Sequence, residues 1–196
     1  MSDKNGFFIT LEGGEGAGKS TLARRLQAEL EKAGYRVVLT REPGGSFLGE
    51  SIRKILLHPG EKRIAPFAEL LLFLAARAQH LQEAIAPALA QGKIVISDRF
   101  SDSTFVYQGI ARVGVPQETV VRFCRDVEGV YTPNLTFLLD ISPEVGLRRA
   151  RHRVLDRIEQ EGLAFHQAIR QGFLEQAAKE KERMVVISAE QPADAV

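Results

Sequence analysis

The chain has 196 residues, of which 44% are hydrophobic and 26% charged, with a formal net charge of +1 at pH 7. The near-zero charge argues against a generally basic nucleic-acid-binding surface, and no apolar run approaches the roughly 18 residues that a membrane span needs. The single cysteine, Cys124, excludes an intramolecular disulfide, and the N-terminus has no basic-then-apolar signal pattern. We therefore expect one cytoplasmic globular domain.

A phosphate-binding loop follows the first predicted strand. The apolar run over residues 7–11 reads as a buried strand, and residues 21–32 begin a helix. Between them, the pattern G-x-x-x-x-G-K-[ST] is formed by Gly13, Gly18, Lys19 and Ser20. Glycines let backbone N–H groups turn inward around a phosphate chain, whose charge the helix N-terminus also favours. We therefore expect a nucleoside triphosphate, with Lys19 at its β- and γ-phosphates and the Ser20 hydroxyl on Mg²⁺.

A second strand is expected over residues 35–40, which completes a βαβ unit. The segment Arg41-Glu42-Pro43-Gly44-Gly45 follows at the C-terminal end of that strand, the edge where open α/β sheets bind ligands. A short amphipathic helix over 47–57 precedes a long helical pattern over 66–90, which Pro87 should bend or end. The long helix is apolar on more than one face, and a surplus apolar face can pack against a second subunit.

Strands and helices keep alternating in the rest of the chain. Residues 93–97 read as a strand that delivers Asp98 and Arg99 to the ligand edge. Further helices are expected at 103–109, 117–128, from 143 and at 164–182, and further strands at 135–140 and 184–188. This alternation predicts an α/β fold of the P-loop NTPase type, a three-layer sandwich in which a parallel five-stranded sheet has helices on both faces.

A P-loop alone is shared by switches, motors and kinases, so the rest of the chain must decide between them. A GTPase would need a guanine-reading N-K-x-D element and a glutamine-bearing switch, and neither is present in the expected form. A kinase for a small acceptor needs a second phosphate site and arginines that close over the γ-phosphate. Arg41, Arg77 and Arg99 fall on or beside the ligand edge, and an arginine-rich tract follows at 148–157. The sequence thus favours a kinase.

The segments EGGEGAGKST, TREPGG, FLAARAQH, SDRFSDSTFVYQG and RARHRVLDRIEQE, in this order and spacing, resemble the bacterial thymidylate kinases of the nucleoside monophosphate kinase group. The match runs over nearly the whole chain. It implies a single domain over residues 1–196 with a mobile lid at about 148–161, an enzyme that uses ATP and Mg²⁺ to convert dTMP into dTDP, and a homodimer packed through long helices. One departure is that this chain stops at Val196, where relatives continue into a final helix.

The resemblance also implies roles for individual residues. ATP would be bound by Gly13, Gly14, Glu15, Gly16, Ala17, Gly18, Lys19, Ser20 and Thr21. dTMP would be bound by Glu15, Arg41, Glu42, Pro43, Arg53, Phe73, Arg77, Arg99, Ser103, Thr104, Tyr107, Gln108 and Glu159. Metal would be held by Ser20 and by Asp98, the latter through the hydration shell of Mg²⁺. Catalysis would rest on Lys19, Arg99, Arg149, Arg151 and Arg153.

Several acceptor-side roles have simpler alternatives. The family places Glu15 on the 3′-hydroxyl of dTMP; Glu15 could instead be a solvated loop residue, although a carboxylate beside a triphosphate is electrostatically unfavourable without a role. Arg99 would bind the acceptor phosphate, and the alternative is a structural ion pair with Asp98. The family also implies a cis bond before Pro43, whereas trans is the general rule.

Base recognition is implied for a helical pair and for the set at 103–108. Phe73 and Arg77 lie four residues apart and share a helix face, where the family stacks the ring on thymine and bonds its exocyclic oxygen to the arginine. Phe73 alone would more often be a core residue, being flanked by leucines, but an arginine within LLLFLAARA needs a partner. In the family a polar residue of the set 103–108 meets the base N3, and Tyr107 crowds the sugar C2′; an ordinary amphipathic helix is the alternative. Glu159 would lie near the acceptor or face solvent.

The arginine-rich tract is the expected source of catalytic charge. Some family members carry a basic residue in the P-loop, and others supply it from the lid; Gly16 occupies that P-loop position here, so the lid must supply it. Arg149, Arg153 and Arg157 recur every four residues and would line one face if the helix continues. Arg153 is the leading candidate, with Arg149 and Arg151 next. A solvated basic face is the alternative.

The sequence therefore predicts an ATP-dependent dTMP kinase whose partners are ATP, dTMP and a second copy of the chain, with no nucleic acid and no membrane. The nearest alternative is a kinase for another pyrimidine nucleotide or for a deoxynucleoside, on the same scaffold. An alternative from another class is a P-loop regulatory NTPase, which would act on a protein partner and need no dTMP.

Overall fold

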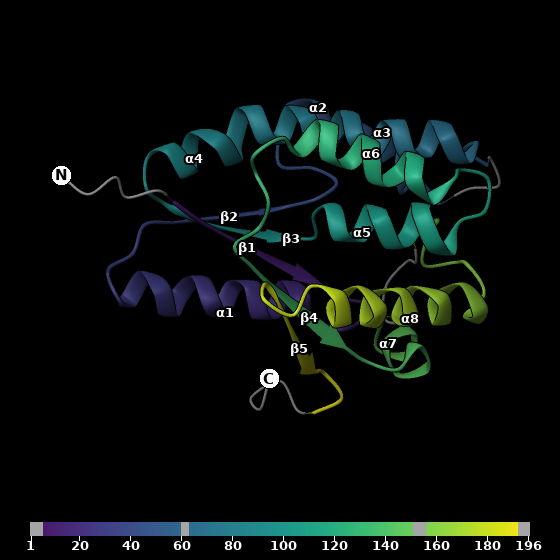
Figure 1. Ribbon diagram of the computed structural model, residues 1–196. Helices are drawn as coiled ribbons and strands as arrows, with labels where there is room; N and C mark the ends of the chain where they lie inside the picture. The colour runs from purple at the N-terminus through teal and green to yellow at the C-terminus, as the bar shows by residue number, and fades with distance from the viewer. Residues whose placement is uncertain (1–5, 60–62, 151–155, 192–196) are drawn as a thin grey trace.

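The computed structural model describes residues 6–59, 63–150 and 156–191, which form one parallel sheet covered by helices (Figure 1). The sheet has the strand order β2-β3-β1-β4-β5, and every neighbouring pair is parallel. Its strands are β1 (Phe7–Glu12), β2 (Val37–Arg41), β3 (Ile94–Asp98), β4 (Leu135–Asp140) and β5 (Met184–Ser188). The predicted five-stranded parallel P-loop fold is therefore confirmed. All five strands point their carboxyl ends at one edge, where such folds bind ligands.

The helices lie on both faces of this sheet. In Figure 1, α2, α3, α4 and α6 lie above the sheet and α1 lies below it. The helical segments are α1 (Lys19–Lys32), α2 (Phe47–Leu56), α3 (Pro66–His80), η1 (Leu81–Ile85), α4 (Ala86–Ala90), α5 (Ser101–Val106), η2 (Tyr107–Ala111), α6 (Gln117–Glu128), α7 (Pro143–Ala150) and α8 (Leu163–Lys179).

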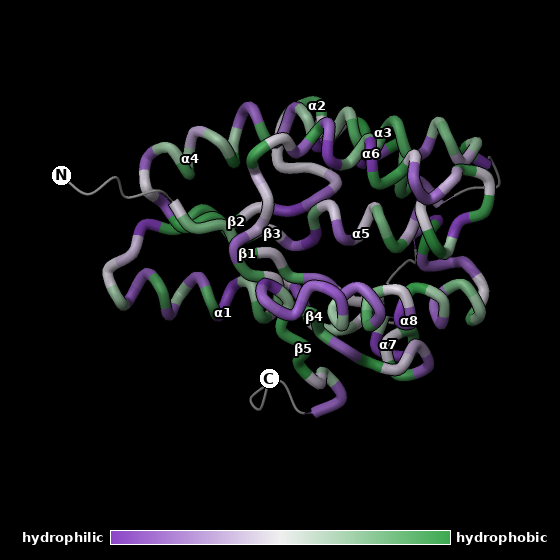
Figure 2. The backbone as a smooth tube through the Cα atoms, in the orientation of Figure 1, coloured by the Kyte–Doolittle hydropathy of each residue, from purple (hydrophilic) through white to green (hydrophobic). Residues whose placement is uncertain are grey.

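The central strand β1 is buried from both faces because its side chains alternate between two cores. Phe8 packs with Phe100 and the η1 and α4 segments on one side, whereas Ile9 and Leu11 pack toward α1 on the other. Figure 2 shows this concentration of hydrophobic residues in the strands. Thr10 is also wholly buried, and its hydroxyl pairs with that of Thr136 at 2.7 Å. β1 is thus packed on both faces, and this packing positions the start of the P-loop that follows it.

The long helix expected over 66–90 is present, with one π-helical interruption. Pro87 has no N–H to donate, so the regular pattern of bonds cannot run through it. The chain widens just before it, and Ala86 donates to Leu81 five residues earlier. A second π-helical turn, η2, ends with Arg112 donating to the Tyr107 carbonyl. The first two residues of this turn, Tyr107 and Gln108, belong to the set at 103–108 predicted to contact dTMP.

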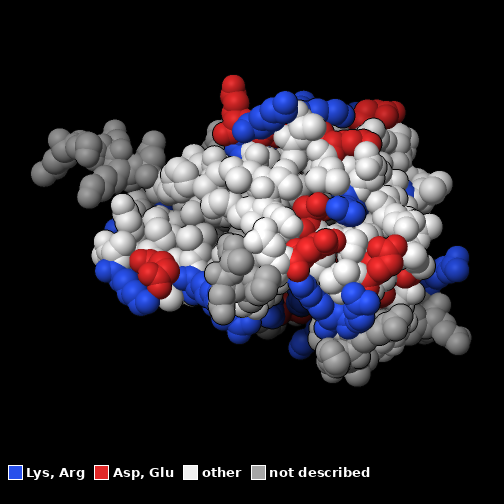
Figure 3. Space-filling model, turned by 90° about the horizontal axis from the view of Figure 1, so that it is seen from below, with Lys and Arg blue, Asp and Glu red and all other residues white. Residues whose placement is uncertain are grey.

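The surface carries charges of both signs. On the face seen in Figure 3, basic and acidic side chains of the described residues lie intermixed. Pairs such as Lys32 with Glu29 are exposed and contribute little stability. Within residues 6–59, 63–150 and 156–191, no helix combines the length and apolar character needed to cross a membrane.

Candidate active site

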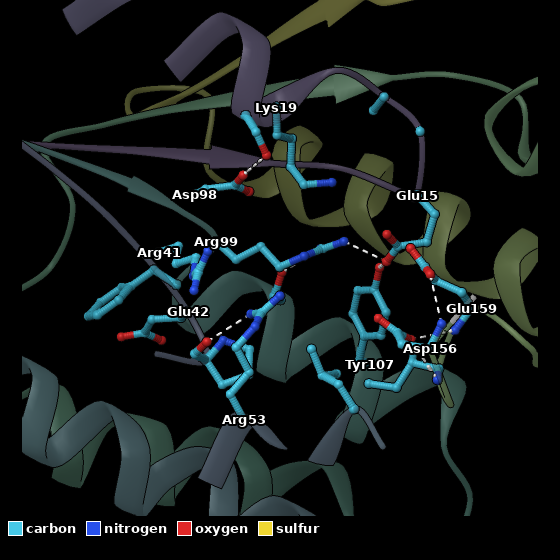
Figure 4. Close-up of a pocket in the computed structure, with 18 of the residues that line it drawn as sticks. Glu15, Lys19, Arg41, Glu42, Arg53, Asp98, Arg99, Tyr107, Asp156 and Glu159 are labelled. Carbon is cyan, nitrogen blue, oxygen red and sulfur yellow. Dashed lines mark hydrogen bonds and ion pairs between the residues drawn. The ribbon is translucent and has the colours of Figure 1, made fainter. Parts of the chain in front are cut away.

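One cavity of about 510 Å³ opens at the carboxyl edge of the sheet, and it gathers most of the predicted site (Figure 4). The site residues predicted from the sequence that line this cavity are Glu15, Gly16, Ala17, Gly18, Lys19, Ser20, Thr21, Arg41, Glu42, Pro43, Arg53, Phe73, Arg77, Asp98, Arg99, Ser103, Thr104, Tyr107, Gln108, Arg149 and Glu159. Segments as distant in the sequence as residues 15–21, 149–150 and 156–159 contribute side chains to it. A single cavity can therefore hold a triphosphate and a second substrate side by side.

The P-loop wraps the start of α1. Gly13, Gly16 and Gly18 have positive φ angles of 133°, 68° and 94°, which side chains other than glycine rarely adopt. The Lys19 ammonium donates to the Gly13 and Gly14 carbonyls at 3.0 and 2.7 Å. Gly13 and Gly14 do not line the cavity themselves but hold this lysine. Burial, followed by the charge of Arg99, lowers the pKa of Lys19.

The P-loop also packs closely on α7, and this contact requires glycine on both sides. A Cβ added to Gly16 would lie 2.1 Å from the Gly146 carbonyl oxygen, and one added to Gly146 would lie 2.2 Å from that of Glu15. A basic side chain at position 16 therefore has no room in this structure. The same contact brings α7 and its Arg149 to the cavity, where Arg149 donates to the Ala189 carbonyl at 2.8 Å.

Ser20 and Asp98 meet where α1 begins and β3 ends. The Ser20 hydroxyl donates to the Asp98 carboxylate at 2.5 Å. A hydroxyl and a carboxylate are the hard oxygen ligands that Mg²⁺ prefers, and this ion keeps several of its waters when it binds between protein and phosphates. The described residues hold no cluster of three or more His, Cys, Asp or Glu side chains suited to a metal. This sparse oxygen pair fits a magnesium ion shared with a nucleotide rather than a closed protein site.

Arg99 reaches across the floor of the cavity to the P-loop. Its guanidinium donates to the Gly13 carbonyl at 3.1 Å, to the Ser103 hydroxyl at 3.0 Å and to the Glu15 carboxylate at 2.6 Å. Its backbone has φ 74°, an uncommon value for a residue other than glycine. Among the described residues, Arg99 forms its salt bridge with Glu15 and not with Asp98. The alternative of a structural Asp98–Arg99 pair is therefore not what the structure shows.

Glu15 is held as a carboxylate by three neighbours. Burial by itself would raise its pKa, but the charges of Arg99 and Lys19 outweigh it and lower the pKa to about 2. The Tyr107 hydroxyl donates at 2.9 Å to Glu15 Oε1, the oxygen that also accepts from Arg99. Burial raises the pKa of the Tyr107 phenol well above 10.0. In Figure 4, Arg99 and Tyr107 converge on Glu15. Glu15 is thus a fixed acceptor at the cavity wall, not a solvated loop residue.

The far end of the cavity combines a ring with amide and guanidinium donors. Phe73 and Arg77 both line it from α3, as their four-residue spacing predicts. Arg77 is only 2% exposed and donates to the Glu42 carboxylate and the Thr104 hydroxyl, both at 2.8 Å. The neighbouring Gln108 donates to Glu69 at 2.9 Å. This end can hold a planar base against Phe73 and read its edge.

Two more arginines stand beside the loop that follows β2. Arg41 pairs with Glu50 at 3.1 Å, and Arg53 donates to the Pro43 carbonyl at 2.8 Å. Burial, followed by the nearby charge of Arg41, lowers the pKa of Arg53. The Glu42–Pro43 bond is cis, as the family resemblance implied. These cations make the middle of the cavity suited to an anionic group.

The arginine-rich tract departs from the expectation at its end. Arg151 and Arg153 lie outside the described residues. Arg157, expected on the same helix face as Arg149, lies instead in a turn and donates to the Leu56 carbonyl and to the Glu69 carboxylate, at 3.0 and 2.5 Å. The prediction of one continuous arginine face is therefore wrong for Arg157, because a buried acidic partner holds it away from Arg149.

Glu159 is close to the cavity, as predicted, and is 3% exposed. Its carboxylate accepts a hydrogen bond from the Asp156 backbone at 3.0 Å. Asp156 and Ile158 also line the cavity but were not singled out in the sequence. The alternative that Glu159 simply faces solvent is thus excluded.

A buried carboxylate that the sequence analysis did not single out holds residues next to the cavity in place. Glu12, the last residue of β1, accepts the Phe100 N–H at 2.8 Å and the Ser103 hydroxyl at 2.5 Å. Burial, with a further contribution from Asp102, raises its pKa from 4.5 to about 7. The only signal in the sequence was an acidic residue at the end of an apolar strand. Its partners lie about ninety positions away, beyond any local pattern.

We expect Glu12→Gln to change how stability depends on pH. Between pH 4.5 and about 7, the folded protein keeps the Glu12 proton and the unfolded chain does not. The raised pKa therefore stabilises the folded protein fully below pH 4.5, and this stabilisation is lost as pH rises through about 7. Between pH 5 and 8 the wild type should lose on the order of 3 kcal/mol that the glutamine variant does not lose. Urea unfolding at both pH values measures this difference. Identical pH dependence in the two proteins would contradict it.

Comparison with known proteins identifies the kind of protein that this chain resembles. A family model described as thymidylate kinase matches residues 11–196. A thymidylate kinase of Chlamydia trachomatis serovar D is 52% identical over 191 residues, which are 96% of this chain and 93% of that protein. One of Pseudomonas fluorescens is 53% identical and covers 95% of this chain and 89% of its own length. A crystal structure of thymidylate kinase from Ehrlichia chaffeensis is 36% identical, with a TM-score of 0.77 over 93% of both chains.

Proposed function

The chain belongs to the thymidylate kinase family, and we propose that its cavity transfers the γ-phosphate of ATP directly to dTMP without a covalent enzyme intermediate. The protein is an ATP-dependent kinase that converts dTMP into dTDP. The observation that carries the proposed division of the site is that one cavity joins the P-loop to the Phe73–Arg77 pair. A triphosphate and a nucleoside monophosphate therefore face each other across Arg99.

ATP is assigned to the P-loop side. The backbone of residues 13–21 and the N-terminus of α1 would surround the phosphates, and Lys19 would leave its two carbonyl partners to meet the β- and γ-phosphates. Ser20 and Asp98 would hold Mg²⁺, which neutralises phosphate charge when bound. The adenine end would lie near the loop after β5, and the bond from Arg149 at the cavity to the Ala189 carbonyl supports this assignment.

dTMP is assigned to the side facing the β2 and β3 ends. Arg99 would bind the acceptor phosphate, with Arg41 and Arg53 beside it. Glu15 would accept a hydrogen bond from the sugar 3′-hydroxyl, and the Tyr107 ring, held by its bond to Glu15, would crowd C2′. Because Arg99 also contacts Glu15, the phosphate and sugar contacts are set by one connected group.

Phosphoryl transfer in this arrangement depends on position and charge. The loose transition state spreads charge over the moving phosphoryl oxygens, and fixed cations on both sides stabilise it. Lys19 would act from the donor side and Arg99 from the acceptor side. Arg149 lies at the cavity on α7, and Arg153 and Arg151, outside the described residues, remain the predicted sources of lid charge.

Acceptor choice tests the proposed pocket. We expect dTMP to be used at least about tenfold more efficiently than dCMP, because an unpaired buried donor at Arg77 costs on the order of 1–3 kcal/mol. UMP should be poor because its 2′-hydroxyl meets the Tyr107 ring. A coupled ADP-release assay with dTMP, dUMP, dCMP, UMP and thymidine measures kcat/KM for each. Thymidine, which brings no phosphate to Arg99, should be inactive.

Two substitutions of Tyr107 distinguish the effect of its ring on acceptor choice from the effect of its hydroxyl. Tyr107→Phe keeps the ring and should retain rejection of UMP, while losing the bond to Glu15. Tyr107→Ala opens the space beside C2′ and should narrow the gap between dTMP and UMP. Equal efficiency of dTMP and UMP in the wild type contradicts the pocket assignment and favours a kinase for another pyrimidine nucleotide.

We also propose that the protein is a homodimer formed through α2 and α3. Large apolar side chains on these adjoining helices face solvent in the single chain: Phe47 is 88% exposed and Ile55 57% exposed, with Phe67 and Leu71 close to half exposed on α3. Figure 2 colours much of both helices as hydrophobic. Contiguous apolar surface of this kind marks association sites.

Light scattering during gel filtration tests this assembly. The wild type should elute with twice the chain mass, and Ile55→Glu should shift it to the monomer because an unpaired charge would be buried between subunits. Val130→Glu is the matched control, since Val130 is 87% exposed but lies in the connection between α6 and β4. A monomeric wild type, or dissociation by the control alone, would contradict the proposed interface.

The cellular location is not part of this test. A cytoplasmic location remains a prediction from the single cysteine and the N-terminal sequence.

A further inference from the structure

His80 closes a chain of buried contacts behind the base-reading end of the cavity. It is the last residue of α3 and is wholly buried. Its Nδ1 lies 3.0 Å from the Glu42 carboxylate, and its Nε2 lies 2.6 Å from the Thr40 hydroxyl. His80 does not line the cavity. It therefore acts on bound substrate only through its neighbours.

The two hydrogen-bond partners of His80 determine which ring nitrogen donates and which accepts. A carboxylate only accepts, so the hydrogen of the His80–Glu42 bond is carried by Nδ1. The Thr40 hydroxyl can then donate to Nε2. Thr40 is in β2 and Glu42 directly follows that strand, so one ring ties the strand end and the following loop to α3.

Glu42 passes this constraint to Arg77. One carboxylate oxygen accepts from His80, and the other accepts from Arg77 Nε at 2.8 Å. Arg77 Nη2 donates in turn to Thr104 at 2.8 Å. A guanidinium is planar, so these two contacts set its plane. Nη1 lies 4.0 Å from the Cys124 sulfur, and the N–H groups of Nη1 and Nη2 that these contacts leave unused have a fixed direction.

The loop leaves no space for the ring to move. A Cβ added to Gly45 would lie 2.3 Å from His80 Nε2 and 2.6 Å from Thr40 Oγ1, and Gly45 has φ 72°. The backbone at residue 45 thus covers the imidazole directly. The loop is thus packed against the buried ring, and Arg77 is linked to that ring through Glu42.

We propose that His80 is a specificity-determining positioning residue, which holds Glu42 so that Arg77 presents its donors to the exocyclic oxygen of thymine. The inference rests on the proposed role of Arg77 in reading the base. Thymine offers an acceptor at that position and cytosine offers an amino donor, so a fixed guanidinium separates them and a loosely held one does not. His80 touches neither substrate and sets selectivity through Glu42.

A matched pair of amide substitutions tests this role. The side-chain amide of His80→Asn stands near the Nδ1 position and can still donate to Glu42, whereas that of His80→Gln extends toward the Nε2 position and cannot serve Glu42 in the same way. We expect His80→Gln to lower the ratio of kcat/KM for dTMP to that for dCMP by about tenfold or more, and His80→Asn to keep most of it. KM for ATP should stay within about twofold in both.

Thr40→Val provides the control for a purely structural effect. It removes the hydroxyl at Nε2 but leaves the His80–Glu42 bond, so it should lower the melting temperature with little change in the dTMP to dCMP ratio. An unchanged ratio in folded His80→Gln overturns the proposal, as does equal loss in the asparagine and glutamine variants. If His80→Gln does not fold, Glu42→Gln, which weakens the link from the other side, must lower the ratio instead.

Arg77→Met separates failure of this inference from failure of the proposed pocket. Loss of discrimination in Arg77→Met together with normal discrimination in His80→Gln overturns only the role of His80. Normal discrimination in Arg77→Met overturns the reading of the base by Arg77, and with it both proposals. Loss in Arg77→Met and His80→Gln with retention in His80→Asn is the expected result.

Discussion

Lys19→Ala should lower kcat by on the order of 10³-fold while leaving the protein folded. Lys19 is the one lysine that lines the cavity within the described chain, and it is 7% exposed. Its two partners are backbone carbonyls of the P-loop, so its ammonium is free to move to phosphate oxygens without breaking an ion pair. Removing it takes away a point charge where negative charge develops.

The measurement is kcat in a coupled ADP-release assay, with the melting temperature recorded for each variant. Lys32→Ala is the matched control, because Lys32 makes an exposed pair with Glu29 at the far end of the same helix. The control should keep the wild-type kcat. Near-normal turnover in folded Lys19→Ala would remove the P-loop from the proposed mechanism.

Arg99→Ala should lower kcat/KM for dTMP by on the order of 10²- to 10³-fold, with a smaller effect on KM for ATP. The guanidinium joins three groups, the Gly13 carbonyl, Ser103 and Glu15, so its loss disturbs the sugar contact as well as the phosphate contact. Without this cation the pKa of Glu15 should rise from about 2, since Arg99 is the largest of the charges that lower it. The variant should therefore lose further activity at acidic pH.

Arg99→Lys refines this test, because lysine keeps the charge but cannot make the same set of directed bonds. We expect it to recover only part of the lost efficiency. Arg170→Ala is the control, since Arg170, on α8, pairs with Asp140 at the end of β4 and does not line the cavity. An Arg99→Ala variant whose KM for dTMP and kcat both match the wild type would show that Arg99 is structural.

The sequence was sufficient for those parts of the site that depend on local pattern. The P-loop pattern, the residues that end β2 and β3, and the Phe73–Arg77 spacing are all short-range features. The structure brings residues 15–21 of the P-loop and the other two features to one cavity. Parallel strands share an edge, so predicting the strands also predicted which side chains would meet.

The parts that could not be predicted depend on partners far apart in the chain. Glu12 is satisfied by Phe100 and Ser103, and His80 by Thr40 and Glu42. The four-residue period predicts Arg157 on a continuing helix, but the buried Glu69, 88 positions away, binds it in a turn instead. A four-residue period describes a helix face only while the helix lasts, and sequence alone did not show where this one ends.

The close contact of Gly16 with Gly146 gives a physical reason for an observation made in the sequence. A P-loop without its own basic residue was expected to rely on the lid, and the structure shows that α7 occupies the space such a residue would need. Arg149, carried by that helix, lies at the cavity. The remaining lid residues, Arg151 and Arg153, stay predictions from the sequence.

The central claim is tested most directly by product stoichiometry with the purified protein, ATP and Mg²⁺, in the presence and absence of dTMP. Direct transfer predicts one dTDP for each ADP formed, and little ADP when dTMP is left out, because the acceptor phosphate completes the site at Arg99. ADP formation at the same rate without dTMP, or ADP formed with dTMP but without dTDP, would contradict the account and favour a regulatory NTPase.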